Sequence, residues 1–474
     1  MMNFSEKSEI VWQGKTYSYS EIDVMIDYVC QKIINIVKDD NLIIGFILNR
    51  SPLLISVIFA LLKLNVTFVP IDIKCPHERK RCIIEQSGLK YCITDISVDD
   101  GLLNYIYLNI NDIKSFKNNK QNLYKLNTNN ELSYIAFTSG SSGEPKGVKV
   151  CKKGLENFIS SIPKIINLHS YSKILCMTNY VFDIFFLESI LAGVIGLKIY
   201  LADNDEIENI RKIKNLLINN EIEIVQITPS RLELLNLIDP EFISLKKVKI
   251  IMIGGEVLPN NLFTKVKSGT NALIYNMYGP VETTIWSSIA DLTNFNTVHL
   301  GKPIANTEIM ILDSNNKILP HGFQGQIAIS GEGLSAGYLN NDELTKQKFI
   351  NLNDKIVYLT GDYGYIDNYL FYLGRKDNQV KIRGFRVELE GIENVIKTMF
   401  DSIIVAVCYV KDNNNDKLIA FYQSKNVISM SSFNKKLINL LPKYMIPNIY
   451  IKVESMPYTK SHKIDKRALL NQYF

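Results

Sequence analysis

The sequence predicts an α/β fold with mainly parallel sheets, divided into a large N-terminal and a small C-terminal domain. The chain has 474 residues, 46% of them hydrophobic, which is ample for a buried core and too much for a single one. Short apolar strands alternate with helical patterns over the first two-thirds, an order typical of layered parallel sheets. After Gly374 the pattern changes to a charged stretch punctuated by glycines. We therefore expect domains over residues 1–376 and 377–474.

The elements of the large domain are predicted from short apolar runs and from the helical patterns between them. Residues 42–48 form the first apolar strand candidate. The apolar segment that follows, 53–64, contains Lys63 and is too short to cross a bilayer, which indicates a buried helix. Further strands are expected at 91–94, 134–137, 222–227 and 249–253, with a helix at 206–219.

The C-terminal segment predicts an α+β unit of its own, with its hinge near Asp377. About 100 residues is an ordinary size for a domain. Its strand pair is joined by an Asp- and Asn-rich run at 412–416, which is typical of a turn. The expected elements are a helix at 393–399, strands at 403–410 and 417–423, a helix at 431–441 and a strand at 449–453.

The composition excludes several classes of protein. The net charge of +5 comes from single lysines rather than blocks, so we expect a solvated basic surface and no nucleic-acid partner. Seven cysteines without a CxxC pair, and five scattered histidines, disfavour a disulfide framework and a zinc site. The N-terminus is polar, and the long apolar stretch 182–202 holds three charged residues, so we expect neither a signal peptide nor a membrane span. We expect a soluble, cytoplasmic protein.

A loop rich in glycine and hydroxyl groups follows the strand at 134–137. Residues 138–147 read TSGSSGEPKG, so backbone N–H and hydroxyl donors crowd one loop and Lys146 adds a positive charge. Such a loop suits a polyphosphate. It is not of the GxxxxGK[ST] kind, because no Ser or Thr follows the lysine to bind Mg²⁺. Taken alone, the run is also compatible with a flexible Ser/Gly linker.

The loop resembles the phosphate loop of the adenylate-forming superfamily, which includes acyl-CoA synthetases, luciferases and the adenylation domains of nonribosomal peptide synthetases. Further motifs occur in the family's order across nearly the whole chain and are most similar to the peptide-synthetase branch. The resemblance implies layered α/β subdomains and a small β-barrel-like part in the large domain, and a mobile small domain. The motifs are KTYSYSE at 15–21, LKLNVTFVPID at 62–72, NMYGPVETT at 276–284, GQIAISGEGLSAGYL at 325–339, YLTGD at 358–362, GRKDNQVKIRG at 374–384, LPKYMIP at 441–447 and SHKIDK at 461–466.

The resemblance also implies which residues bind ATP and Mg²⁺. Tyr278 would stack on adenine, Asn276 would hydrogen-bond its edge, and Asp362 would accept both ribose hydroxyls. Glu282 would ligate Mg²⁺, which prefers carboxylate oxygens beside substrate phosphates. Thr138 is assigned to both the nucleotide and the metal. The remaining nucleotide contacts are assigned to Ser139, Gly140, Ser141, Ser142, Gly143, Gly255, Glu256, Gly279, Thr283, Tyr372, Arg375 and Lys381.

Lys463 resembles the C-terminal lysine that reaches the α-phosphate and the attacking carboxylate, and Lys146 is assigned as a second catalytic cation. The reaction needs such a charge, because two anions repel each other and charge on the transferring phosphorus must be offset. The chain departs from the family pattern at Ser142 and Val281, where threonine is usual, and at 461–462, where Asn-Gly is usual. None of these changes removes a charge that the chemistry needs.

Asp183 indicates which kind of acid the enzyme would take. A carboxylate inside the apolar run 181–187 needs a cation partner. In the peptide-synthetase branch this partner is the α-ammonium group of an amino acid, which disfavours fatty and aryl acids; a structural partner is the alternative. The other pocket positions are Ile184, Leu187, Gln226, Met252, Gly254, Met277, Ile285 and Trp286, a combination similar to that of glycine-activating domains. Because four of them are bulky, we expect glycine, with some leakage to alanine.

The sequence carries no Asp-Ser-Leu-type carrier motif, and few residues follow Lys463. We therefore expect a free-standing enzyme that loads the phosphopantetheine thiol of a separate carrier protein, with coenzyme A as the alternative acceptor. By resemblance, the small domain rotates about Asp377, withdrawing Lys463 and bringing the loop at Gly384 to the thiol. Two other functions stay open: an acyl- or aryl-CoA ligase of the same superfamily, and a non-catalytic ATP-binding homologue.

Overall fold

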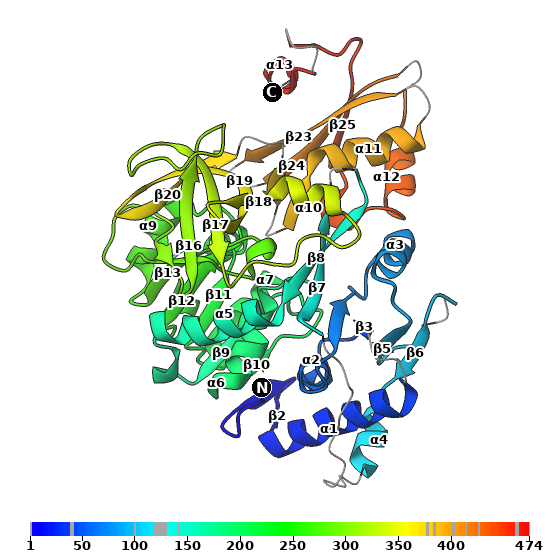
Figure 1. Cartoon of the computed structure of the whole chain (residues 1–474), viewed down its shortest axis with the longest axis vertical. Coiled ribbons are helices and arrows are strands. Elements are labelled where there is room, and N and C mark those ends of the chain that lie inside the picture. The colour runs from blue at the N-terminus through cyan, green and yellow to red at the C-terminus, as the bar shows by residue number, and fades with distance from the viewer. Residues whose placement is uncertain are drawn as a thin grey trace. The chain divides into compact units, whose positions relative to one another are not determined.

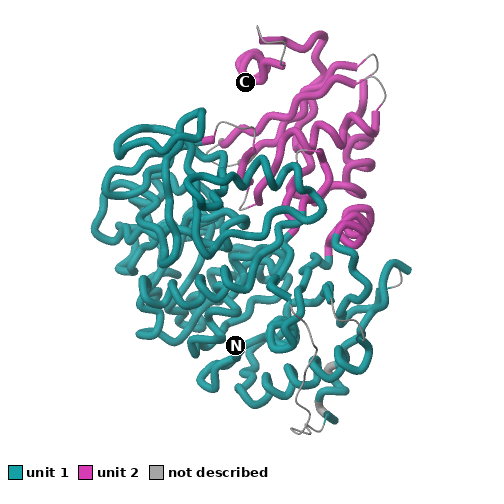
Figure 2. Tube along the Cα trace, viewed as in Figure 1, with its two compact units in different colours: residues 1–73, 87–136, 147–374 teal, residues 74–86, 137–146, 375–474 magenta. Residues whose placement is uncertain are grey.

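The computed structural model describes residues 2–37, 42–98, 101–116, 130–140, 142–375, 379–382, 385–400, 403–412, 415–424, 427–459 and 464–473. The chain forms two compact units (Figure 2). The larger unit comprises residues 1–73, 87–136 and 147–374, and the smaller unit comprises 74–86, 137–146 and 375–474. The phosphate loop therefore groups with the C-terminal residues. The predicted hinge, Asp377, lies outside the described residues, and the domain boundary at 376 stays a prediction.

A nine-stranded sheet forms one layer of the larger unit (Figure 1). Its order is β15-β14-β13-β12-β11-β9-β10-β1-β2, and the six strands from β13 to β1 run parallel. The bounds are β1 (Glu9–Trp12), β2 (Lys15–Tyr17), β9 (Lys173–Cys176), β10 (Lys198–Leu201), β11 (Ile224–Ile227), β12 (Ile250–Gly254), β13 (Leu273–Tyr278), β14 (Ser288–Asp291) and β15 (Lys302–Pro303). This confirms the predicted α/β class with mainly parallel pairing.

A second sheet has six strands in the order β6-β5-β3-β4-β7-β8. Its strands are β3 (Ile43–Ile47), β4 (Thr67–Pro70), β5 (Tyr91–Thr94), β6 (Asn104–Tyr107), β7 (Leu132–Ser139) and β8 (Pro145–Cys151). A third, antiparallel sheet stands where the resemblance implies a barrel-like part: β16 (Thr307–Leu312), β17 (Gly325–Gly331), β18 (Phe349–Leu352), β19 (Lys355–Asp367) and β20 (Tyr369–Arg375). It is ordered β16-β17-β19-β18, with β20 paired to β19.

The helices of the larger unit begin at recognisable sequence signals. Ser18 and Glu21 form a capping box at the start of α1, and Pro52 occupies the first turn of α2, where its missing N–H is not needed. The helices are α1 (Tyr19–Ile36), α2 (Pro52–Lys63), α4 (Ile110–Ser115), α5 (Lys152–Ile165), η1 (Leu168–Ser170), η2 (Leu187–Leu191), α6 (Ala192–Ile195), α7 (Ile210–Asn219), α8 (Pro229–Ile238), η3 (Ile243–Leu245), α9 (Asn260–Gly269), η4 (Val281–Thr283) and α10 (Asp342–Lys348).

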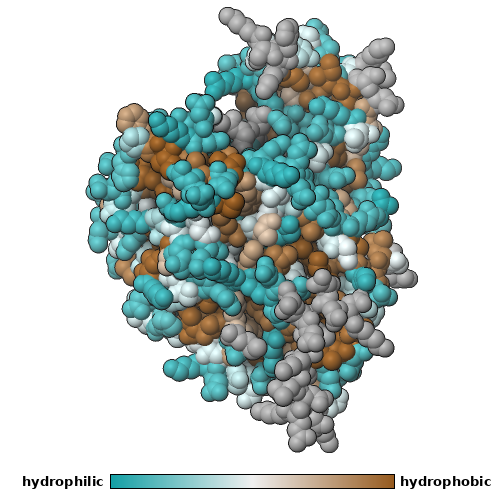
Figure 3. Space-filling view, viewed as in Figure 1, coloured by the Kyte–Doolittle hydropathy of each residue, from teal (hydrophilic) through white to brown (hydrophobic). Residues whose placement is uncertain are grey.

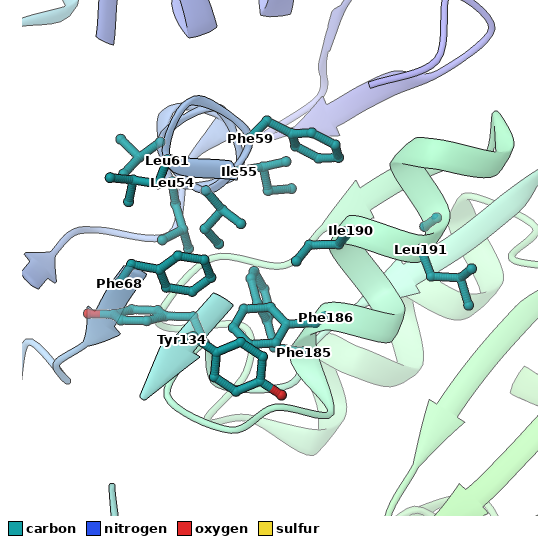
Figure 4. Packing of buried hydrophobic residues seen from close by; sticks show 14 of the residues in the cluster. Leu54, Ile55, Phe59, Leu61, Phe68, Tyr134, Phe185, Phe186, Ile190 and Leu191 are labelled. Atoms are coloured by element: carbon teal, nitrogen blue, oxygen red, sulfur yellow. The ribbon is translucent and has the colours of Figure 1, made fainter. Parts of the chain in front are cut away.

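The core of the larger unit is built around aromatic side chains. Phe68 and Tyr134 stack with ring centroids 5.7 Å apart, and Phe186 meets Tyr134 at 4.7 Å. Figure 4 shows these rings gathered near the α2 side chains Leu54 and Ile55. All five residues are buried. Exposed large hydrophobic residues are scattered, and Figure 3 shows them interspersed with hydrophilic residues on the visible face.

The smaller unit combines a hairpin, a three-stranded sheet and helices. The hairpin pairs β21 (Gln379–Ile382) with β22 (Phe385–Glu388). The sheet is ordered β23-β24-β25. The remaining elements are α3 (His77–Ser87), whose last residue belongs to the larger unit, α11 (Leu389–Met399), β23 (Ile404–Asp412), β24 (Asn415–Gln423), α12 (Met430–Leu437), η5 (Lys443–Met445), β25 (Ile449–Lys452) and α13 (Lys466–Tyr473).

Several predicted bounds were wrong by up to four residues. The helix predicted from 206 begins at Ile210, because Asn209 caps it by accepting the N–H of Arg211. The helix predicted from 393 begins earlier, at Leu389, directly after β22. The helix predicted to end at 441 ends at Leu437. The strands at 91–94 and 249–253 agree with β5 and β12 to within one residue at each end.

Candidate active site

The phosphate loop lies within the smaller unit, between the end of β7 and the start of β8. The hydroxyl of Ser139 is buried, donates to the carbonyl of Arg386 at 2.7 Å and accepts from the N–H of Glu388 at 3.2 Å. Lys146 Nζ lies 3.3 Å from Glu388 Oε1. The loop is therefore fixed at both its ends by groups of β22.

Two further hydroxyl residues of the loop differ in exposure. Thr138 Oγ1 is buried, and nothing in the described part of the chain hydrogen-bonds to it. A buried hydroxyl without a partner is costly, so such a group suits a ligand or an ion. Ser142 is exposed, and Ser141 lies outside the described residues.

Asn276 and Tyr278 stand two residues apart on β13, so they share one face of the strand. Asn276 Nδ2 donates to the carbonyl of His299 at 2.9 Å, which leaves its amide oxygen to accept from a ligand. The hydroxyl of Tyr278 donates to Asp362 Oδ2 at 2.6 Å. A hydrogen bond this short to a carboxylate is charge-assisted, so Tyr278 fixes the carboxylate predicted to bind ribose.

Glu282 lies in η4, just after β13, and its side chain is fully buried. Its Oε1 accepts a hydrogen bond from the hydroxyl of Tyr338 at 2.8 Å. A buried carboxylate needs such a donor or a cation, because burial alone disfavours the charge. Tyr338 thus orients the carboxylate that the resemblance assigns to Mg²⁺.

His299, whose backbone carbonyl accepts the hydrogen bond from Asn276, is held in place through its ring. Its ring is buried, stacks on Tyr369 with centroids 4.3 Å apart, and meets Phe295 edge-on at 4.6 Å. Its Nδ1 accepts the N–H of Gly301 at 3.1 Å, which assigns the neutral tautomer with hydrogen on Nε2. Burial lowers the pKa of His299 below its ordinary value of 6.5. Protonation would put a hydrogen on Nδ1 facing the Gly301 N–H.

We expect His299 to make the protein less stable in acid. Because its folded pKa is below the unfolded value of 6.5, the unfolded chain binds the proton more readily, and stability falls as the pH drops below that value. The drop in melting temperature between neutral pH and about pH 5 should be smaller by about 1–2 °C in His299→Gln. Exposed His169→Gln is the matched control. An equal acid-induced drop in wild type and His299→Gln would contradict this assignment.

The residues of the predicted substrate pocket converge on the C-terminal ends of neighbouring parallel strands. Gln226 of β11 is in register with Met252 of β12, and Gly254 of β12 is in register with Met277 of β13. In parallel α/β sheets this edge is where ligands bind. Gln226 Nε2 is buried, and within the described ranges it has no hydrogen-bond partner.

Trp286 packs closely against Gly254 of β12. A Cβ added to Gly254 would lie 2.6 Å from Trp286 Cη2 and 2.9 Å from Met277 Cβ, so only glycine permits this close approach. Trp286 is 1% exposed and belongs to the same buried cluster as Leu187, Met277 and Ile285. Bulky side chains therefore fill the space beyond the strand ends.

Asp183 accepts a hydrogen bond from a neighbour of Trp286: the N–H of Ile285 donates to Asp183 Oδ2 at 3.2 Å. Thr284 and Ile285 have φ angles of 61° and 64°, although β-branched residues disfavour the left-handed region. The Thr284 hydroxyl, bonded to the Gly333 carbonyl at 2.7 Å, helps to hold this strained turn. In this turn the Ile285 N–H points toward the Asp183 carboxylate.

The remaining predicted site residues fall on several elements. A Cβ added to Gly255 would lie 3.3 Å from Ile184 Cδ1, so these two residues adjoin. Glu256 Oε2 accepts from the backbone N–H of Ser230 at 3.1 Å. Thr283 lies in η4, with its hydroxyl 2.6 Å from that of Ser287. Gly279 directly follows β13; Tyr372 and Arg375 lie on β20, and Lys381 lies on β21. Lys463, Asp377 and Ser141 lie outside the described residues.

Sequence reasoning missed the partners that orient the predicted groups. Tyr338, His299 and Glu388 received no role, although Tyr338 stands in a motif that matched the family. Tyr134 was assigned only to a strand, yet its hydroxyl is fully buried and lacks a hydrogen-bond partner in the described part of the chain. Burial and the nearby Asp183 carboxylate hold the pKa of Tyr134 well above its ordinary value.

Two other kinds of feature are absent from the described part of the chain. Within the described ranges, no cluster of three or more His, Cys, Asp or Glu residues could hold a metal ion. In those same ranges, no helix combines the length and the apolar character needed to span a bilayer.

Comparisons with known proteins agree with these motifs. The family model described as AMP-binding enzyme matches residues 2–339. Zwittermicin A synthase ZmaJ of Bacillus cereus is 31% identical over 97% of this chain and 91% of its own length. Bacitracin synthase 3 of Bacillus licheniformis is 30% identical over 98% of this chain, which spans only 7% of that protein.

A solved structure is also similar in fold. It is described as holo-AB3403, a four-domain nonribosomal peptide synthetase bound to AMP and glycine. It is 28% identical, with a TM-score of 0.67 over 96% of this chain and 34% of that chain. The chain therefore belongs to the family of AMP-binding enzymes, as an adenylation domain of the nonribosomal peptide synthetase type.

Proposed function

We propose that the chain activates glycine with ATP, forming glycyl-adenylate and pyrophosphate, and then transfers the glycyl group to the phosphopantetheine thiol of a separate carrier protein. The observation that carries the proposal is the set of residues around the ends of β11 to β13, where the substrate pocket is predicted. It combines one carboxylate, Asp183, with a wall of bulky apolar side chains around Trp286. This combination suits a small substrate that bears an ammonium group.

Asp183 supports an amino acid rather than a fatty or aryl acid. Its side chain is 6% exposed and one oxygen accepts the N–H of Ile285, so the carboxylate is fixed in direction. A fixed, buried carboxylate gains most from a cation that reaches it, and an α-ammonium group is such a cation. An acid without an amine would bring no such cation to the carboxylate.

Trp286 and its neighbours support glycine among the amino acids. The indole lies so close to Gly254 that no Cβ fits between them, and Met277 and Ile285 belong to the same buried cluster. A substrate side chain would compete with these groups for space. The glycine bound to the related synthetase structure agrees with this assignment. Because one methyl group changes binding by only ~1–3 kcal/mol, alanine should be accepted weakly.

In the first step, a carboxylate oxygen of glycine bonds to the α-phosphorus of ATP, the bond from that phosphorus to the bridging oxygen breaks, and pyrophosphate leaves. No general base is needed, since the carboxylate is already ionised. We assign Lys463 to the attacking carboxylate and the α-phosphate, and Lys146 to the departing phosphates. Positive charge at these points lowers the barrier by offsetting the repulsion of two anions.

The residues present fit a magnesium ion beside the phosphates. The buried carboxylate of Glu282 and the hydroxyl of Thr138, which has no hydrogen-bond partner among the described residues, are the hard oxygen donors that Mg²⁺ prefers. We infer that these two residues hold the ion. When bound, it would neutralise part of the phosphate charge.

In the second step, the thiol sulfur bonds to the glycyl carbonyl carbon, the bond to AMP breaks, AMP leaves, and the thiol proton passes to solvent. We infer that the C-terminal domain turns about Asp377 between the two steps. This turn would withdraw Lys463 and bring the loop at Gly384 to the thiol, as the family resemblance implies. Polar hinge residues of this kind accommodate large backbone changes.

An ATP–pyrophosphate exchange panel tests the proposal. We expect the highest exchange with glycine, alanine lower by roughly 10- to 200-fold, and background values with valine, phenylalanine, acetate and benzoate. A larger amino acid ranked above glycine would refute the specificity. Exchange with acetate or benzoate would indicate a CoA ligase instead, and ATP binding without any exchange would indicate a non-catalytic homologue. Thiol transfer is then measured with holo carrier protein against coenzyme A as acceptors.

A further inference from the structure

We propose that Glu388 is a positioning residue that holds Lys146 when no phosphate occupies the phosphate loop, so that a polyphosphate must displace it to bind. The inference rests on the proposed function only in naming the ligand as a polyphosphate, the triphosphate of ATP or the released pyrophosphate. Both residues belong to the smaller unit, as does the whole stretch 137–146. Glu388 thus acts as an internal anion for the lysine.

The ion pair between these residues is partly shielded from water. Lys146 Nζ is 3.3 Å from Glu388 Oε1, and the two side chains are only 13% and 16% exposed. Gln379 Nε2 donates to the same carboxylate oxygen at 2.5 Å. Shielding strengthens an ion pair relative to one on the open surface. Glu388 is therefore fixed toward the lysine from two sides.

Glu388 ends β22 and directly precedes α11, and its side chain turns away from the helix. It is the N-cap residue of that helix, yet its side chain makes no capping hydrogen bond. An acidic group beside a helix N-terminus ordinarily gains from the helix dipole. Here the carboxylate instead reaches Lys146.

The loop backbone also packs tightly against α11. A Cβ on Gly391 would lie 2.4 Å from the carbonyl oxygen of Gly140, and a Cβ on Gly143 would lie 2.8 Å from Val395 Cγ2. Gly143 has a φ of 98°, which favours glycine independently. The Ser139 hydroxyl bridges the loop to β22 as well. The ion pair is thus one of several contacts that hold the loop closely against β22 and α11, and it is not an isolated surface contact.

Competition for Lys146 has a measurable consequence. An ammonium group that is paired most of the time is free to bind phosphate for only the remaining fraction, and the apparent Kd rises by the inverse of that fraction. Removing the carboxylate charge should therefore tighten polyphosphate binding. After adenylate formation, the same contact would oppose the return of pyrophosphate and so favour the forward reaction.

Binding of inorganic pyrophosphate to the full chain, measured by titration calorimetry, tests the inference. We expect Glu388→Gln to bind roughly five- to tenfold more tightly than wild type, because the competing anion is gone. In the Lys146→Ala background, Glu388→Gln should have no effect, since a double-mutant cycle isolates the pair. The matched control is Glu454→Gln, which removes an exposed charge of the same unit and should leave the Kd unchanged.

Equal or weaker pyrophosphate binding by Glu388→Gln would overturn the inference, as would an undiminished effect of that change in the Lys146→Ala background. If Glu388→Gln fails to fold, Glu388→Asp keeps the charge but shortens the side chain by one methylene group, and it should also bind pyrophosphate more tightly. The binding readout requires no turnover. A negative exchange panel would therefore refute the proposed function and leave this inference to be decided by calorimetry.

Discussion

Replacing Lys463 by Ala is expected to reduce glycine-dependent ATP–pyrophosphate exchange by about 10²- to 10³-fold or more, the usual effect of removing a group that stabilises transition-state charge. The attacking carboxylate and the α-phosphate are both anionic, and we assign this ammonium group to neutralise them as they meet. Thiol transfer from glycyl-adenylate supplied ready-made should be largely spared. In that step the electrophile is already activated, so the lysine has no charge to offset.

The two half-reactions separate this role from a general loss of structure. Exchange is followed with labelled pyrophosphate, and transfer is followed as glycyl-carrier formation from added adenylate. Lys435→Ala, which removes an exposed lysine of the same unit, should leave both rates near wild type. Equal loss of both half-reactions in Lys463→Ala would contradict the division of labour between the two steps.

The fold class could be predicted from the sequence, because it depends on local patterns, whereas the substrate pocket rests on the family resemblance and stays a prediction. Short apolar runs between helical segments predicted the bounds of β5, β11 and β12 to within about two residues. This is possible because buried parallel strands are continuous apolar runs. Helix bounds were less accurate, because capping decides where a helix begins and ends. Capped by Asn209, α7 begins at Ile210, four residues after the predicted start of the helix at 206.

The contacts that orient the site could not be predicted in the same way. Tyr278 and Asp362 are 84 residues apart, Tyr338 and Glu282 are 56 apart, and Lys146 and Glu388 are 242 apart. No local periodicity encodes such pairs; they arise when strands from distant parts of the chain become neighbours. The family resemblance supplied the ligand-binding residues but not the residues that hold them. The structure therefore adds the tyrosine hydroxyls that fix two carboxylates.

The second large effect on activity is expected from a change at Asp183, the carboxylate of the predicted substrate pocket. Asp183→Asn is expected to lower kcat/KM for glycine in the exchange reaction by about two orders of magnitude or more, because the substrate's ammonium group would face a neutral amide. Asparagine keeps an oxygen that can accept the Ile285 N–H, which Asp183 accepts at 3.2 Å, so the strained turn beside it should persist. Binding of ATP alone should remain near wild type, since the change concerns only the amine-bearing substrate.

A control variant that removes a carboxylate elsewhere on the same unit shows whether the lower kcat/KM of Asp183→Asn comes from the change in net charge alone. Asp354 is exposed and has a φ of 62°, a conformation that asparagine adopts as readily as aspartate. Asp354→Asn should therefore leave exchange unchanged. If Asp183→Asn retained glycine activation within a few-fold of wild type, its carboxylate would be serving the fold through Ile285 rather than the substrate. The acid would then have to be recognised by groups other than its amine, and the assignment to amino acids would fail.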